Sequence, residues 1–249
     1  MSFERPHETI SWAKEAIDDF DREVRTFFNG NATEYVIDVD PRTGDNIHKI
    51  RLKQPLPGRL SRFANDALSH TRNAFDQTIH GACLSLGIKK STSPHFPWRS
   101  NPTDLEKTFE NGKIPDSLWD VIRQQEPYPT GEGYTGGDDA MREVSKIAKW
   151  KHNVGLSVDV QAGSAMAPGV TGRVSRYITP PLIWDNVNNE LPILIVNPEA
   201  KLDGRYQVGL LIVFDVPGVL EKKSANSLMR LFVEKAQRFL EETEAAVRV

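Results

Sequence analysis

The chain has almost no cysteine, since Cys83 is the only one in 249 residues. A single thiol excludes a disulfide bond within the chain and excludes any zinc site with several cysteine ligands. So little cysteine is typical of proteins that function in a reducing compartment. We therefore expect the protein to be cytoplasmic.

Long apolar runs are also missing. No stretch approaches the roughly 20 apolar residues that a helix needs to cross a bilayer, and the N-terminal residues carry charges where a signal peptide is apolar. The 31 Lys and Arg residues nearly balance the 34 Asp and Glu residues, for a net charge of -3. The chain as a whole therefore does not attract nucleic acid. We expect a soluble protein with no membrane partner. A local RNA or phosphate contact, a protein partner and a homo-oligomer stay open.

Helical periodicity is present in four segments. Apolar residues recur every three or four positions near residues 8–28, 58–84, 139–152 and 220–246. This spacing places them on one face of a helix, so each segment is predicted to be an amphipathic helix packed on a core. Two carboxylates at Asp138 and Asp139 suit the start of the third helix.

Strand patterns occur in two places. The run from residue 34 to 53 alternates apolar and polar residues on both sides of a turn sequence at 40–45, which predicts a β-hairpin. Residues 153–217 are rich in β-branched residues and predict a small, mostly antiparallel sheet. Residues 91–137 hold only short apolar clusters and predict a long, partly ordered excursion, with Asp116 as the cap of a short helix.

These segments predict an α+β fold. We expect one domain over residues 1–249, with a helical core from 7–152 and 218–247 and a β-rich segment at 153–217. No linker divides the chain, and no internal repeat is visible.

The stretch LSHTRNAFDQTIH, residues 68–80, concentrates polar groups on the second predicted helix. A helical wheel places Asn65, Arg72 and Asp76 in one polar row beside the apolar stripe. His70 lies on the opposite flank, and His80 points away from the stripe. The strip therefore does not converge on one site, and only the polar row borders the core.

Lys151 falls at an inward position of the third predicted helix. A buried ammonium group needs an acidic partner, because its desolvation costs several kcal/mol. We predict a polar network of Asn65, Arg72, Asp76 and Lys151 that joins the two helices, with His152 at its rim. The structural interpretation is that Arg72, Lys151 and His152 only pair with the carboxylate of Asp76 and cap a helix end. The functional one is that Arg72, Lys151 and His152 bind a phosphate or assist the cleavage of a phosphodiester.

Four motifs carry a family resemblance. HTRNAFDQ at residues 70–77 resembles the His-Asn-Leu-Arg-Ser-Ala-Leu-Asp-His signature of a group of functionally uncharacterised bacterial proteins. FPW at 96–98, QQEPY at 124–128 and KHN at 151–153 resemble later motifs of that group, in the same order. The likeness covers most of residues 8–160, and the C-terminal third has no such likeness.

That group's Arg-x4-His pattern is in turn similar to the signature of HEPN domains, helical bundles of which many are metal-independent ribonucleases. The resemblance implies that Arg72 is the matching arginine, whereas Gln77 occupies the position of the matching histidine. A glutamine side chain cannot act as a general acid or base near neutral pH. The sequence therefore favours a non-enzymatic binding or assembly module. A HEPN-like ribonuclease or phosphate-ester enzyme that uses Arg72, Lys151 and His152 is the alternative.

No cofactor or metal is expected. The segment 131–136 fits G-x-G-x-x-G, but no strand precedes it, and the two carboxylates that follow would repel a pyrophosphate. The histidines lack the spacing of metal-binding helices. The role of the glycine-rich loop at 129–137 stays open.

Overall fold

A computed structural model of the chain describes residues 3–88, 95–112, 114–154, 156–166, 168–204, 206–215 and 223–248, without the side chains of residues 150–154. The chain divides into two compact units. Unit 1 comprises residues 1–21, 61–157 and 215–249, and unit 2 comprises residues 22–60 and 158–214. The single-domain prediction stays a prediction.

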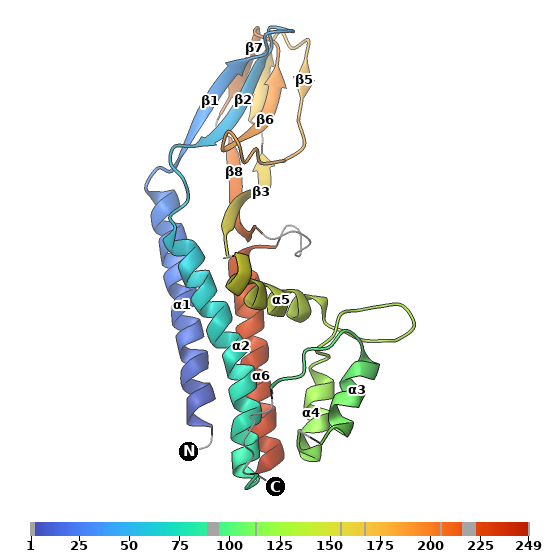
Figure 1. The fold of residues 1–249 in the computed structure, drawn as a ribbon. Helices are drawn as coiled ribbons and strands as arrows, with labels where there is room; N and C mark the ends of the chain where they lie inside the picture. The colour runs from blue at the N-terminus through green and yellow to red at the C-terminus, as the bar shows by residue number, and fades with distance from the viewer. Residues whose placement is uncertain are drawn as a thin grey trace. The chain divides into compact units, whose positions relative to one another are not determined.

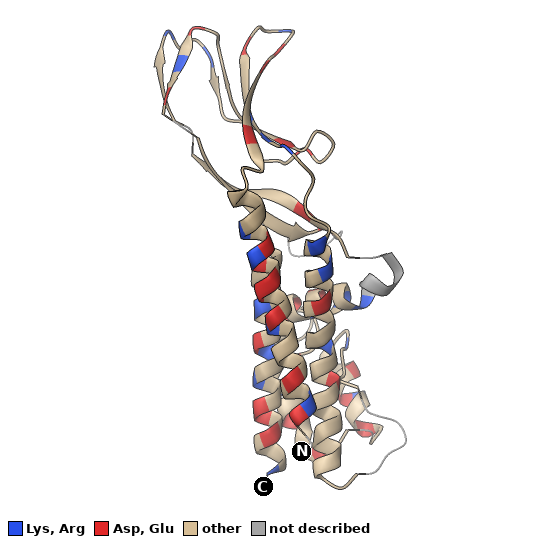
Figure 2. Cartoon of the chain, turned by 90° about the vertical axis from the view of Figure 1, so that its left-hand side faces the viewer, with Lys and Arg blue, Asp and Glu red and all other residues tan. Residues whose placement is uncertain are grey.

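Three long helices form the frame of unit 1. They are α1 (Glu4–Asn29), whose first part belongs to this unit, α2 (Arg59–Ser85) and α6 (Ala225–Val247), and they run side by side (Figure 1). Ser224 caps α6, because its side chain accepts a hydrogen bond from the backbone N–H of Ser227. Arg230 of α6 pairs with Asp18 and Asp21 of α1. Both signs of charge alternate along the outer faces of these helices (Figure 2).

Shorter helices occupy the stretch between α2 and α6. They are α3 (Pro102–Glu110), η1 (Asp116–Leu118), α4 (Trp119–Gln124) and α5 (Asp139–Val154). Asn101 caps α3, and its side chain accepts a hydrogen bond from the backbone N–H of Asp104 at 2.8 Å. Asp116 is the first residue of η1 rather than its cap, which is Pro115 without a side-chain hydrogen bond. The predicted excursion therefore holds more helix than its composition suggested.

An aromatic cluster fills the core of unit 1. Phe75 of α2 packs against Phe232 and Phe239 of α6, with ring centroids 5.6 and 5.5 Å apart. Phe96 and Trp98, which follow α2 in the chain, complete the cluster at 4.7 Å from each other. Phe75, Phe232 and Phe239 are at most 1% exposed. Burial of such large rings is the main stabilising contribution in this core.

Unit 2 contains the strands. The predicted hairpin is present as β1 (Thr33–Val39) and β2 (Asn46–Leu52), and it continues into a four-stranded sheet of order β1-β2-β6-β5. In that sheet β6 (Glu190–Val196) pairs antiparallel with both β2 and β5 (Tyr177–Ile178). Two further antiparallel pairs join β3 (Val158–Met166) to β8 (Gln207–Phe214), and β4 (Gly169–Gly172) to β7 (Ala200–Asp203).

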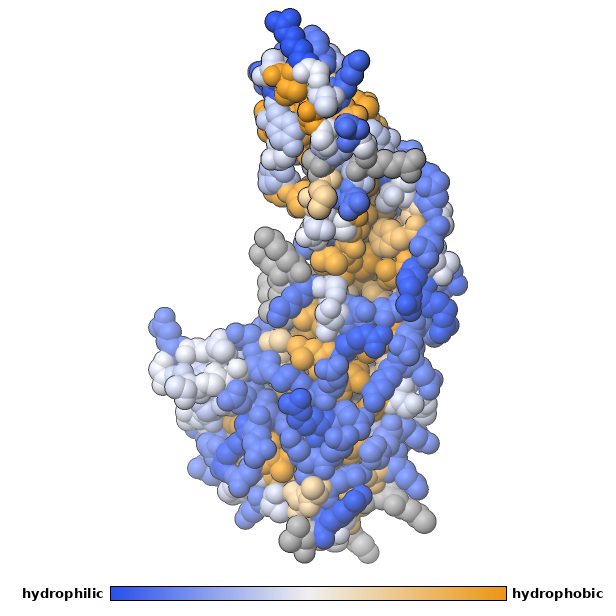
Figure 3. All heavy atoms as spheres, turned by 180° about the vertical axis from the view of Figure 1, so that it is seen from behind, coloured by the Kyte–Doolittle hydropathy of each residue, from blue (hydrophilic) through white to orange (hydrophobic). Residues whose placement is uncertain are grey.

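The four-stranded sheet is buried mainly along β6. Leu191, Leu194 and Val196 have no exposed surface, whereas the edge strand β1 exposes half of Ile37 and more of Val39. Apolar patches also reach the surface between hydrophilic residues in the view of Figure 3.

The α+β prediction is confirmed, with antiparallel strand pairs at both sequence positions. Helices α1, α2, α5 and α6 correspond to the four predicted main helices, and α3 and α4 are shorter additions. The start of the last predicted helix, at 218–222, lies outside the described residues. No helix in the described part of the chain is long and apolar enough to cross a membrane.

Candidate anion-binding site

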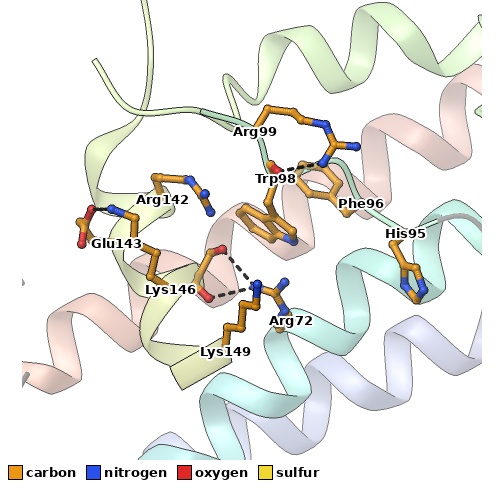
Figure 4. A pocket seen from close by; sticks show the side chains of 10 residues that line it. Arg72, His95, Phe96, Trp98, Arg99, Arg142, Glu143, Lys146 and Lys149 are labelled. Atoms are coloured by element: carbon orange, nitrogen blue, oxygen red, sulfur yellow. Dashed lines mark hydrogen bonds and ion pairs between the residues drawn. The ribbon is translucent and has the colours of Figure 1, made fainter. Parts of the chain in front are cut away.

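A pocket of about 690 Å³ opens in unit 1 between α2, α5 and the segment that follows α2 (Figure 4). Its lining is dominated by cationic side chains, which are Arg72, Arg99, Arg142, Lys146 and Lys149. The only carboxylate among the lining residues is Glu143, and the remaining lining residues are His95, Phe96, Trp98 and Ser145. The pocket is therefore strongly positive in a chain whose net charge is -3.

Helix spacing explains how α5 supplies three of these cations. Arg142, Lys146 and Lys149 are four and three residues apart, so they share one face of the helix. The opposite face holds the apolar residues Met141, Val144, Ile147 and Ala148, each about 1% exposed. Packing of the apolar face on unit 1 turns the cationic face toward the pocket.

Arg72 extends from α2 to α5. One Nη of its guanidinium donates to the backbone carbonyl of Ser145 at 2.9 Å and to the Ser145 hydroxyl at 3.0 Å. The guanidinium carbon lies 5.4 Å from the centre of the Trp98 ring, which is a cation–π distance. Ser145 is fully buried, so this contact ties the two helices together below the pocket.

Like charges face one another in this pocket. Burial lowers the pKa of Arg72; the nearby charge of Arg142 lowers it further, and only Asp76 opposes this. Burial also lowers the pKa of Arg142; the charge of Glu143 opposes this shift, and the like charge of Arg99 adds to it. Arg142 thus repels an arginine on either side.

Direct ion pairs are few among these cations. Within the described residues, no acidic group lies within ion-pair distance of Arg72, Arg99, Arg142 or Lys149, and only Lys146 pairs with Glu143. Arg99 instead donates to the Thr108 hydroxyl at 2.6 Å and to the carbonyl of Trp98 at 3.0 Å. Arg72 and Arg99 are thus held by neutral oxygens rather than by carboxylates.

Asp76 lies one turn beyond Arg72 on α2 and anchors the wall of the pocket. Its carboxylate accepts a hydrogen bond from the backbone N–H of Phe96 at 2.8 Å and contacts Nδ1 of His95 at 3.1 Å. This fixes the start of the Phe96-Pro97-Trp98 segment against α2.

The structure brings together only part of the predicted polar network. Arg72 contacts Ser145, and Asp76 contacts Phe96 and His95. Asn65 contributes its backbone carbonyl to a 2.6 Å hydrogen bond from Ser69. The side chains of Lys151 and His152 lie outside the described residues, so their contact with Asp76 and their catalytic roles stay predictions.

Gln77, at the position of the HEPN histidine, faces away from this pocket. Its side-chain carbonyl accepts a 2.8 Å hydrogen bond from the Thr9 hydroxyl of α1, whereas Arg72 faces α5. His70 stacks edge-on against Trp12 of α1, at 5.6 Å between ring centroids. His80 is exposed, as the helical wheel indicated.

Sequence reasoning missed most of the cationic lining. The signal was the spacing of Arg142, Lys146 and Lys149, a cationic stripe beside the apolar stripe of the same helix. The wall formed by Trp98 and Arg99 could be found only through its contact with α2, which no local pattern encodes.

Unit 2 has a pocket of a different character, of about 580 Å³. It is lined mainly by apolar and aromatic residues of β1, β2 and β7, among them Tyr35, Ile37 and Leu202, and its lining includes no Asp, Glu, Lys or Arg, with His48 as the titratable residue nearest neutral pH. Burial lowers the pKa of His48, so this ring is neutral at pH 7. The cationic pocket of unit 1 is thus the candidate for binding a charged ligand.

No protein-family model, curated protein or solved structure matches the chain. The candidate site therefore rests on geometry and charge alone.

Proposed function

We propose that the protein is a binding module that holds a phosphorylated small molecule in the cationic pocket of unit 1. The observation that carries the proposal is that the row Arg72, Arg142 and Arg99, together with Lys146 and Lys149, lines one pocket of about 690 Å³ whose lining holds a single carboxylate, Glu143.

The pocket holds an excess of positive charge when no anion is bound. Partly buried charges lose hydration, and the two neighbouring carboxylates, Asp76 and Glu143, offset only part of the charge of five cations. An anion between the guanidinium groups reverses the sign of these interactions. Unfavourable electrostatics of this kind are typical of functional sites.

The residue types favour phosphate over a carboxylate. Arginine presents planar pairs of N–H donors that match two oxygens of a phosphate, and such charge-assisted hydrogen bonds are about twice as strong as neutral ones. A phosphate monoester carries up to two negative charges at pH 7, which suits several cations better than a single carboxylate does. Lys146, which pairs with Glu143, and Lys149 add two ammonium groups to the lining.

Titration calorimetry with ribose 5-phosphate tests the proposal. We expect the wild-type protein to bind it, and we expect Arg142→Gln to weaken binding by roughly tenfold or more, because one charge-assisted contact contributes about 1.5–3 kcal/mol. Arg238→Gln is the matched control, since Arg238 is an exposed arginine of α6 that does not line the pocket. It should bind like the wild type.

Absence of binding by the folded wild-type protein at millimolar ligand would overturn the proposal. Equal affinities of Arg142→Gln and Arg238→Gln would show that the phosphate binds elsewhere.

A further inference from the structure

The pocket is larger than a phosphate group requires. A volume of about 690 Å³ lies in the range of sites that enclose whole organic ligands, about 300–1,000 Å³. A ligand that fills this pocket therefore needs a body beyond its phosphate, and the uncharged part of the lining indicates which chemistry that body would match.

The uncharged lining is aromatic. Phe96 is buried at the base, and Trp98 is half-buried beside it, so the indole forms the accessible part of this surface. Figure 4 shows the Trp98 ring among the side chains of Arg72, Arg142 and Arg99. A flat apolar surface surrounded by cations suits a ligand that carries an aromatic ring and a phosphate together.

The indole is also held rigidly. Its ring packs against Phe75, Phe96 and Phe232, with centroid distances of 5.2, 4.7 and 5.9 Å. The guanidinium of Arg72, which is fixed by Ser145, lies over the Trp98 ring and adds a second planar group to this wall. Nucleobases stack both on aromatic rings and on arginine planes. A preorganised surface loses little entropy when a ligand binds.

We propose that the ligand is a nucleotide, with its phosphate on the arginine row and its base against the wall of Trp98 and Arg72. The inference rests on the proposed function for the phosphate contact and adds the base. A sugar phosphate satisfies the cations but leaves the aromatic wall exposed to water. A free mononucleotide and a nucleotide within an RNA strand share this chemistry.

Calorimetry with AMP, ribose 5-phosphate and adenosine tests the base and the phosphate separately in the wild-type protein. Stacking of one base contributes about 1–3 kcal/mol, so we expect AMP to bind at least about fivefold more tightly than ribose 5-phosphate, and adenosine to bind weakest. Equal affinities for AMP and ribose 5-phosphate would overturn the nucleotide inference and leave the proposed function intact. No binding of either phosphate compound would overturn both.

Variants at the wall locate the base. Trp98→Leu should reduce AMP affinity to that of ribose 5-phosphate, and Trp98→Phe should retain part of the difference. Trp12→Leu, at a tryptophan of α1 outside the pocket, is the matched control. Melting curves identify any variant that does not fold, and the wild-type comparison decides the inference in that case. An unchanged preference for AMP in folded Trp98→Leu would overturn the assignment of the base to this wall.

A single-stranded hexaribonucleotide distinguishes the two sources of the nucleotide. Tighter binding of the oligonucleotide than of AMP, also lost in Trp98→Leu, supports an RNA strand as the ligand. Weaker binding supports the free mononucleotide. Binding of the oligonucleotide that is indifferent to both Trp98→Leu and Arg142→Gln would contradict the nucleotide assignment for this pocket.

Discussion

Glu190 shows at the residue scale how unit 2 accommodates a buried charge. It is 5% exposed, and its carboxylate accepts hydrogen bonds from Lys49 at 2.6 Å and from Arg51 at 2.7 and 3.0 Å. We expect Glu190→Gln to destabilise the protein by about 2–3 kcal/mol, because Lys49 and Arg51 then lose a buried anion that they share. Urea unfolding followed by circular dichroism measures the change. Asp203→Asn, which alters an exposed carboxylate of β7, should have little effect.

The carboxylate of Glu190 also makes the effect of Glu190→Gln on stability depend on pH. Burial by itself raises the pKa of Glu190, but the hydrogen bonds and charges of Lys49 and Arg51 outweigh it and hold that pKa below its usual range. The stabilisation is therefore complete above the unfolded-state pKa of about 4.3 and is lost as the pH falls through the folded-state value. The stability difference between wild type and Glu190→Gln should be constant above about pH 5 and shrink below about pH 4. A difference that grows on acidification contradicts this assignment.

Residue patterns located the part of the candidate site on α2, but not the residues that α2 contacts there. The wheel of α2 placed Arg72 and Asp76 beside the core, and both lie at the pocket or its wall. A wheel gives the direction of each Cβ but not the reach of a long side chain. It therefore could not show that Arg72 contacts Ser145, or that Asp76 meets the backbone of Phe96.

At the scale of the element, α5 depends on its first turn. The carboxylate of Asp138 accepts a hydrogen bond from the backbone N–H of Met141 at 2.8 Å and pairs with Lys235 of α6. The adjacent carboxylates of Asp138 and Asp139 indicated this helix start. An acidic side chain at that position accepts a hydrogen bond from a free N–H and interacts favourably with the positive end of the helix dipole. These contacts fix the first turn of α5, while the packing of its apolar face directs the cationic face toward the pocket.

Substitutions at Asp138 separate the two contacts. Asp138→Ala should destabilise the protein by about 1–2 kcal/mol, since it removes both the cap and the ion pair. Asp138→Ser keeps a capping oxygen and should lose less. Thermal unfolding of the two variants measures the difference, and equal losses would mean that the cap contributes nothing.

The strand patterns predicted which face of each strand is buried, but not which sequence-distant strand it pairs with. Period-two alternation marked β1 and β2 as a hairpin, and their antiparallel register from Thr33↔Leu52 to Val39↔Asn46 agrees. Nothing in that alternation shows that β2 also pairs with β6, about 140 residues later, as in Ile50↔Leu191. Local periodicity reports which side of a strand is buried, whereas the choice between sequence-distant strands depends on the packing of the whole unit.

At the scale of the whole molecule, unit 1 is assembled from three separate stretches of the chain and unit 2 from two. The four elements that meet at the aromatic core and the pocket, α2, the Phe96–Arg99 segment, α5 and α6, span residues 59 to 247. The α+β class could be predicted because helical and strand periodicity are local properties of each segment. The pocket could not be predicted in the same way, since it exists only where these distant stretches meet.

The net charge of the whole chain makes a prediction about salt. Because the total is -3, the long-range field does not attract an anion, and the attraction must come from the cations within the pocket. Raising the salt concentration from about 0.1 M to about 1 M shortens the screening length from about 10 Å to about 3 Å. Ribose 5-phosphate affinity should therefore fall roughly tenfold or more over this range. Arg142→Gln, with one cation fewer, should show a shallower dependence of log Kd on log salt. Parallel dependences in the wild type and this variant would mean that Arg142 does not contact the charge of the ligand, and the arginine row would then lose its role in binding.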